Sequence, residues 1–149
     1  MRLVVQRVLE SSVTIDGEVV GRIGKGYMVL CGVEDGDTQK DLEYCVKKTV
    51  GLRVFEDDDG KMNRSILDVG GEILAISQFT LHGDARRGNR PSFITAARPE
   101  LAVPMYDDYC RGLRDAGIHV ETGVFQADMK VSLINDGPVT ILIDSRRVF

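Results

Sequence analysis

The sequence is poor in the residues that build disulfides and metal sites. Its 149 residues include three cysteines, and no two of them have the spacing of a CxxC pair. An odd number of widely separated cysteines makes neither a disulfide framework nor a zinc site. We therefore predict that Cys31, Cys45 and Cys110 are buried thiols, and we predict no metal and no other cofactor.

Histidine is scarcer still, with His82 and His119 alone. His82 lies two residues after Thr80, so the two side chains share a strand face if the strand continues that far. His82 is then a candidate general base for Thr80. No third residue is placed to orient it, and a histidine at a strand end is more often a surface residue. A Cys-His or Ser-His-Asp arrangement is thus only weakly indicated.

Long apolar runs and an excess of positive charge are also absent. No segment reaches the roughly 18 apolar residues of a membrane helix, and no basic-then-apolar leader precedes the strand-like RLVVQRV at Arg2, so we expect a cytoplasmic protein. The formal net charge of −4 argues against a protein that coats nucleic acid, because such binding needs many cationic contacts to phosphates. ARRGNRP, with Arg86, Arg87 and Arg90, is a local basic patch. Charged runs of this kind usually form a solvent-exposed loop with no binding role.

The periodicity of the apolar residues predicts one α/β domain over residues 1–149. Residues 2–34 alternate like three or four short strands, with a hairpin turn at Asp16-Gly17. Helical spacing appears over residues 37–52 and again over 98–117, where Pro104 marks either a kink or the true start of the helix. Further strands are predicted at LRVF (52–55), EILAISQFTL (72–81), 119–135 and 139–145. We expect mainly antiparallel strands in a layered or barrel-like β core, with two helices covering one face.

Two segments match known binding loops only in part. GRIGKG, residues 21–26, lacks the first glycine of a Walker phosphate loop and has glycine where serine or threonine follows the lysine. EDDDG, residues 56–60, lacks the twelve-residue calcium pattern. We interpret both as turns.

A Gly-Pro pair stands in the middle of the strand-like VSLINDGPVTILID, residues 131–144. Proline has no amide hydrogen to donate to a sheet and fixes its own φ, so the pair must interrupt the pairing. The Asn, Asp and Gly before the proline tolerate positive φ. The structural interpretation is a short loop between Val131–Ile134 and Val139–Ile143.

The segment SQFTL, residues 77–81, ends a buried strand and leads into a long loop. Strand ends are where rigid scaffolds present reactive groups, and a hydroxyl beside free backbone amides can hold a nucleophile or an oxyanion. Taken alone, the pentapeptide fits an ordinary strand equally well.

Six motifs together resemble the bacterial D-aminoacyl-tRNA deacylases in order and spacing. They are QRV at 6–8, GKMN at 60–63, SQFTL at 77–81, GNRPSF at 88–93, ADM at 127–129 and NDGPVT at 135–140. The resemblance covers nearly the whole chain, and SQFTL together with NDGPVT is its most specific part. Gln126 is a departure, since the family has a small residue there.

This resemblance implies a homodimeric hydrolase that cleaves the ester between a D-amino acid and the terminal ribose of tRNA, and that removes glycine from mischarged alanine tRNA. Aminoacyl-tRNA is then the partner, with no membrane and no DNA. In the family the Gly-Pro bond is cis and enters the active site of the other subunit, which assigns a filter against L side chains to Gly137 and Pro138. A rigid backbone wall rejects an L side chain by clash whatever its chemistry, and every ~1.4 kcal/mol of clash is about a tenfold change in rate or affinity.

The resemblance also assigns roles to residues. Thr80 corresponds to the proposed catalytic threonine, but a threonine hydroxyl without a base is a poor nucleophile. The alternative is substrate-assisted hydrolysis, in which the ribose 2′-hydroxyl helps to activate water and the amides around Gln78, Phe79 and Thr80 hold the oxyanion. The remaining assignments are Ser77 and Gln78 to shape the pocket, Met129 to line it and Arg7 to brace the Gly-Pro loop.

Contacts to the acceptor-stem phosphates are assigned to Arg86, Arg87 and Arg90, which follow SQFTL closely. Two other function classes stay open. One is a non-catalytic nucleic-acid-binding module on the same fold, and the other is a generic esterase that uses Thr80 and His82.

Overall fold

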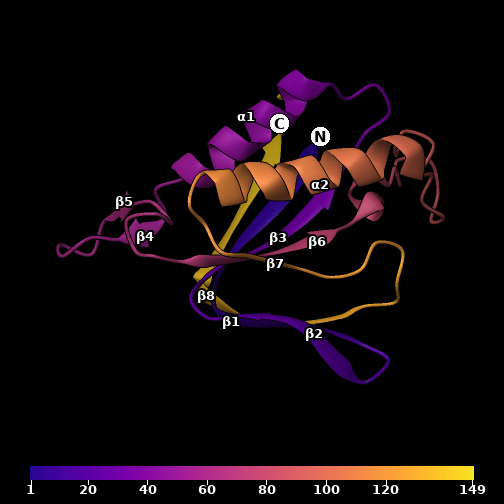
Figure 1. The fold of residues 1–149 in the computed structure, drawn as a ribbon. Coiled ribbons are helices and arrows are strands. Elements are labelled where there is room, and N and C mark those ends of the chain that lie inside the picture. The colour runs from indigo at the N-terminus through magenta and orange to yellow at the C-terminus, as the bar shows by residue number, and fades with distance from the viewer.

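The computed structural model describes residues 1–149 and places two helices on one side of a curled sheet (Figure 1). The main sheet has the order β2-β1-β3-β6-β7, and β8 pairs with β1. Its strands are β1 (Arg2–Ile15), β2 (Glu18–Ile23), β3 (Gly26–Gly32), β6 (Glu72–Ser77), β7 (Val120–Thr122) and β8 (Lys130–Asp144). The other elements are α1 (Gln39–Gly51), β4 (Phe55–Glu56), β5 (Met62–Arg64), a 3-10 helix (Phe79–His82) and α2 (Pro99–Asp115).

The sheet is antiparallel on one side of β3 and parallel on the other. β1 pairs antiparallel with β2, β3 and β8, whereas β3 pairs parallel with β6, and β6 with β7. A parallel pair needs a crossover connection, and α1 and α2 lie in these two connections. The predicted α/β class and the two helices on one face are confirmed, while the prediction of mainly antiparallel strands holds only for the part built on β1.

Both predicted helices form, within the predicted ranges. At the start of α1 the Asp41 carboxylate accepts a hydrogen bond from the backbone amide of Thr38 at 2.8 Å. α2 begins at Pro99, so Pro104 lies inside the helix and does not mark its start. The hydroxyls of Thr49 and Tyr109 lie 2.9 Å apart and join the two helices inside the core.

Other predictions for the N-terminal half are confirmed. Asp16 and Gly17, with φ of 50° and 79°, form the hairpin turn between β1 and β2. GRIGKG spans the turn from β2 to β3, and EDDDG contains the turn between β4 and β5. All three cysteines are free and buried.

The core has two parts on opposite faces of the central strands. The larger cluster lies between the helices and the sheet and includes Tyr27, Phe55 and Tyr109. The smaller one, with Val13, Met28 and Leu74, fills the space inside the curl that β1, β2 and β8 make. Burial of these side chains drives the sheet to close on itself in a barrel-like way.

The Gly-Pro pair interrupts the pairing, but as a bulge within β8 and not as a loop between two strands. Asn135 lies opposite Val8 and Thr140 opposite Gln6, so five steps along β8 match two along β1. The prediction of two strands joined by a loop is therefore wrong in form. A bulge keeps the strand in the sheet while its extra residues project from it.

Two of the predicted strands are longer than the strands in the structure. The strand from residue 72 stops at Ser77, because the chain then turns into the 3-10 helix. The segment 119–135 contains a short β7, a loop and the start of β8. Among the helices, none is long and apolar enough to cross a membrane.

The parallel pairing of β3 with β6 requires glycine at position 26. Gly26 lies opposite Glu72, and an added Cβ would lie 1.8 Å from the Glu72 carbonyl oxygen. We predict that Gly26→Ala lowers the free energy of unfolding by about 3 kcal/mol, because the backbones must move apart. Urea denaturation followed by circular dichroism measures this loss.

Gly51→Ala is the matched control for this prediction. An added Cβ at Gly51, the last residue of α1, meets nothing within 4 Å, so the variant should be as stable as the wild type or slightly more so. Equal stability of the Gly26→Ala variant and the wild type would contradict the close approach of the two strands.

Candidate active site

The candidate site lies where β6 ends beside β3. Ser77 pairs with Cys31 in the last step of the parallel ladder, and the next amide, that of Gln78, donates to the Cys31 carbonyl at 2.8 Å. The chain then leaves the sheet and forms one turn of 3-10 helix, in which the Leu81 amide donates to the Gln78 carbonyl at 3.3 Å. This turn, and not a longer strand, presents the SQFTL residues.

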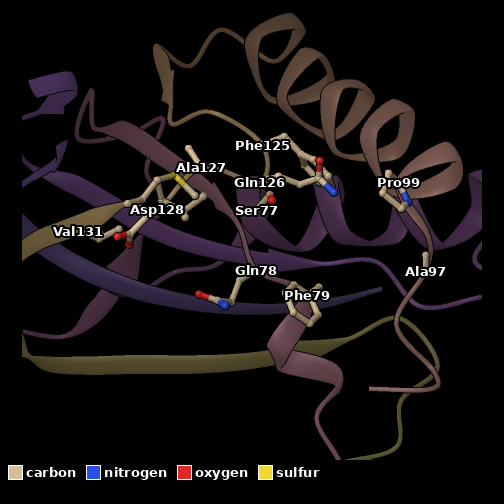
Figure 2. A pocket seen from close by; sticks show the side chains of 12 residues that line it. Ser77, Gln78, Phe79, Ala97, Pro99, Phe125, Gln126, Ala127, Asp128 and Val131 are labelled. Carbon is tan, nitrogen blue, oxygen red and sulfur yellow. The ribbon is translucent and has the colours of Figure 1, made fainter. Parts of the chain in front are cut away.

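A cavity of about 630 Å³ opens at this strand end (Figure 2). Its volume falls in the range of small-molecule sites. The predicted residues Ser77, Gln78, Phe79 and Met129 all line it. The other lining residues come from β6, the segment before α2, the first residue of α2, the loop after β7 and the start of β8: Ile76, Ala97, Pro99, Phe125, Gln126, Ala127, Asp128 and Val131.

Sequence reasoning missed several of these lining residues. Ala127 and Asp128 belong to the ADM motif, which carried a signal, whereas Phe125 and Pro99 stand outside every motif. Gln126, the departure from the family pattern, lines the cavity and has φ of 67°, a left-handed conformation that favours smaller residues.

The two backbone amides that follow Gln78 are free: that of the lining residue Phe79 and that of Thr80, which does not itself line the cavity. The amides of Phe79 and Thr80 open the 3-10 helix and donate to no backbone or side-chain acceptor, because the first amides of a helix have no partner within it. The Gln78 amide is already engaged by Cys31, so it is unable to hold an oxyanion. Phe79 and Thr80 therefore provide a pair of donors of the kind that stabilises a tetrahedral oxyanion.

Thr80 has a hydrogen-bond partner but no base. The Gln78 side-chain amide donates to the Thr80 hydroxyl oxygen, which leaves the hydroxyl hydrogen free to donate elsewhere. No histidine, lysine or carboxylate is bonded to this hydroxyl. A threonine in these surroundings is better suited to position a substrate than to attack it.

His82 does not serve Thr80. At about 120° per residue in a 3-10 helix, residues two apart lie on different sides, so the shared strand face does not exist. The His82 side chain is buried against Gly32, its Nε2 has no partner, and burial lowers its pKa. The expectation of a surface histidine and the esterase built on Thr80 and His82 are both contradicted by this placement.

Gly137 and Pro138 lie outside this cavity. They are exposed at the bulge of β8, and the peptide bond between them is cis. At Gly137 φ is 121°, and an added Cβ would lie 2.9 Å from Val139 Cγ2. Within one chain the structure thus separates the Gly-Pro pair from SQFTL.

Arg7 is buried directly behind this bulge. Its guanidinium donates to the Val54 carbonyl at 2.6 Å and to the Asp136 carbonyl at 3.2 Å, and it lies 3.3 Å from the Asp136 carboxylate. The Asn135 side-chain amide donates to the carbonyls of Arg7 and Val139 at 2.9 and 3.0 Å. Because buried charges need such partners, these bonds hold the bulge in one shape.

The three arginines lie on a hairpin beyond the 3-10 helix. Asp84 and Ser92 pair through two backbone bonds, and Arg86, Arg87 and Arg90 lie between them, all exposed. They do not line the cavity. No group of three or more His, Cys, Asp and Glu side chains is placed to hold a metal ion.

The family model described as D-Tyr-tRNA(Tyr) deacylase matches residues 4–144 of the chain. The chain belongs to this family. It is 62% identical over 149 residues to a D-aminoacyl-tRNA deacylase of Desulfitobacterium hafniense, with both chains covered completely. It is 58% identical over 145 residues to a D-aminoacyl-tRNA deacylase of Thermus aquaticus. This match covers 97% of this chain and 95% of the Thermus aquaticus enzyme.

A solved structure has the same fold as this chain. It is named c-Myc DNA Unwinding Element Binding Protein and is 44% identical to this chain, with a TM-score of 0.91. The match covers 97% of this chain and 98% of that protein's chain. As a member of the deacylase family, the protein is a hydrolase that acts on the ester bond of D-aminoacyl-tRNA.

His82 provides a test of the site in this deacylase. Burial holds its pKa below the 6.5 of the unfolded chain, so the unfolded state binds more protons and stability falls as the pH drops below 6.5. We predict that His82→Leu reduces this loss between pH 7 and pH 5, and that it leaves the deacylation rate within about threefold of the wild type. Urea denaturation at each pH and a deacylation assay measure the two effects.

A loss of activity of about a hundredfold or more in a folded His82→Leu protein would show that His82 takes part in the reaction. An unchanged pH dependence of stability would show that His82 is not buried in its neutral form.

Proposed function

We propose that the cavity binds the D-aminoacyl-adenosine end of charged tRNA, and that the Gly137-Pro138 bulge of a second subunit completes it. One observation carries this proposal: the cavity is lined on several sides by SQFTL and the loop after β7, while the exposed bulge of the same chain takes no part in it. The bulge is held rigid by Arg7 but has no role within its own chain. In a dimer it can enter the open cavity of the other chain.

The bulge suits a filter for chirality. Gly137 presents no side chain, and the buried Arg7 fixes the segment through Val54 and Asp136. A rigid backbone wall excludes an L side chain by clash and leaves room for a D side chain on the opposite side of the α-carbon. Glycine has no side chain to exclude, so the same filter admits glycine mischarged on alanine tRNA.

The homodimer is supported by uncovered apolar side chains near the bulge. Ile134 and Leu142 of β8 are 48% and 57% exposed, and neither packs against the two buried core clusters. A symmetric dimer that buries them gives each bulge access to the other subunit's cavity. We also propose that residues 1–149 act as one domain and that the enzyme works in the cytoplasm, where its substrate is found.

Hydrolysis proceeds in this proposal without a base from the protein. Water attacks the ester carbonyl carbon while the 2′-hydroxyl of the terminal ribose accepts a proton from it. The developing oxyanion receives hydrogen bonds from the amides of Phe79 and Thr80. The ester bond then breaks, the 2′-hydroxyl passes a proton to the departing ribose 3′-oxygen, and the free amino acid and tRNA are released. Thr80 orients the substrate with its free hydroxyl hydrogen.

In this proposal the exposed arginines of the hairpin, Arg86, Arg87 and Arg90, contact phosphates of the tRNA acceptor end. Arg86 is paired with Asp84, whereas Arg87 and Arg90 form no salt bridge within the chain. Cations free of internal partners are suited to phosphate contacts that carry no sequence information.

A second candidate is a nucleic-acid-binding module without catalysis. The name of the structural neighbour that is 44% identical supports it, since that protein is named for binding a DNA element. The two candidates differ in turnover, because a binding module leaves an aminoacyl ester intact.

The first prediction from this proposal concerns chirality. We expect the protein to hydrolyse D-tyrosyl-tRNA and to leave L-tyrosyl-tRNA intact under the same conditions. Pro138→Ala loosens the wall and should raise the rate on the L ester at least about tenfold, with the D rate changed only a few fold. Parallel time courses of acid-precipitable radiolabelled amino acid measure both rates.

Pro104→Ala is the control, because Pro104 is an exposed proline of α2 outside the cavity. Hydrolysis of both esters by the wild type would contradict the filter, and hydrolysis of neither would favour the binding module.

The second prediction separates substrate-assisted hydrolysis from attack by Thr80. D-tyrosyl-tRNA that ends in 2′-deoxyadenosine should react about a hundredfold more slowly than the ribose form, because the proton acceptor is missing. Thr80→Val should lose about tenfold on the ribose form, as expected when one hydrogen bond to the substrate is removed. Single-turnover rates measure both.

A nucleophilic Thr80 would give the reverse pattern: a small effect of the deoxy substrate, complete loss in Thr80→Val, and an acyl-enzyme of increased mass in the mass spectrum of quenched wild-type protein.

A further inference from the structure

Three large apolar side chains face solvent instead of the core, one in the 3-10 helix that borders the cavity and two in the segment before α2. Phe79, Phe93 and Ile94 are 56%, 38% and 89% exposed. The two phenylalanine rings meet edge to face, with centroids 5.2 Å apart and an interplanar angle of 72°. We name Phe79, Phe93 and Ile94 the apolar ledge.

The apolar ledge is continuous with the cavity at one end. Phe79 is itself a lining residue, and in Figure 2 its ring lies at the edge of the cavity below Pro99. Phe93 extends this surface away from the cavity, because it packs on Phe79 and lies close to Gly83. A molecule that leaves the cavity past Phe79 therefore passes over Phe93.

At its other end the ledge meets the positively charged hairpin. The backbone bonds between Asp84 and Ser92, of 2.8 and 2.9 Å, close this hairpin directly before Phe93. Its tip carries Arg87 and Arg90, which form no salt bridge within the chain. Aromatic faces and unpaired cations thus follow each other on one path away from the cavity.

We propose that the apolar ledge stacks the bases of the unpaired nucleotides that precede the terminal adenosine of the tRNA, and that Arg87 and Arg90 contact their phosphates. This rests on the proposed placement of the aminoacyl-adenosine in the cavity. Stacking on aromatic side chains combined with a cationic path is how proteins hold single-stranded nucleic acid, and it is tolerant of sequence because every base has a flat face. Such tolerance suits an enzyme that accepts many tRNAs.

The experiment compares two substrates that differ only in the nucleotides on the ledge. D-tyrosyl-tRNA contains them, whereas D-tyrosyl-adenosine, with the same ester, does not. For the variant Phe93→Ala/Ile94→Ser we expect the KM for D-tyrosyl-tRNA to rise about tenfold with kcat within twofold of the wild type, and the KM for D-tyrosyl-adenosine to stay unchanged. Phe93→Tyr keeps an aromatic face and should restore the KM to within about twofold.

Two results would overturn the proposal. An equal loss on both substrates would mean that the ledge only supports the cavity. A change from dimer to monomer in light scattering, with activity lost on both substrates, would mean that a second subunit covers the ledge.

A binding measurement keeps this test separate from the proposed function. Uncharged tRNA and the same tRNA trimmed of its unpaired 3′ nucleotides are titrated with wild type and variant. A loss confined to intact tRNA supports the ledge even if no ester is hydrolysed, and equal binding of wild type and variant to intact tRNA overturns it. Arg87→Gln/Arg90→Gln should reduce the salt dependence of binding, whereas the ledge variant should retain it.

Discussion

The parallel pairing of β3 with β6 is the constraint on which the site depends. Close approach at Gly26 starts the ladder and the pair Cys31 and Ser77 ends it. Because Cys31 also accepts the hydrogen bond of the Gln78 amide, the turn that follows begins at one defined residue. The end of this ladder fixes the positions of the two free amides and of the Phe79 ring. The geometry of the site therefore depends on the backbone pairing of β3 with β6.

A second constraint acts at the other end of β3, where Arg7 of β1 lies opposite Tyr27. Arg7 is charged and buried, and it is satisfied by backbone carbonyls and one carboxylate drawn from the bulge of β8 and the segment before β4. Leaving such a charge without partners costs several kcal/mol, so the bulge keeps its shape as long as Arg7 is in place. The chirality filter that we propose requires rigidity of this kind, because a flexible wall would also admit L side chains.

The sequence predicted features that depend on local patterns. The Asp16-Gly17 hairpin, the two helices and the buried cysteines follow from turn chemistry, helical spacing and residue type, and the motifs SQFTL and NDGPVT indicated the family. Features that depend on contacts between residues far apart in the sequence were not predicted. The end of β6 is set by Cys31, more than forty residues earlier, and the bulge by register against β1, while Phe125 reaches the cavity only through the path of the loop after β7.

The three thiols have a consequence for the enzyme under oxidising conditions. Burial raises the pKa of all three, that of Cys45 to about 12 and that of Cys110 to about 11, so the reactive thiolate scarcely forms while the protein is folded. Oxidants and alkylating reagents therefore act on these cysteines only when the core between the helices and the sheet opens. The rate at which the enzyme reacts with a thiol reagent therefore reports how often this core opens.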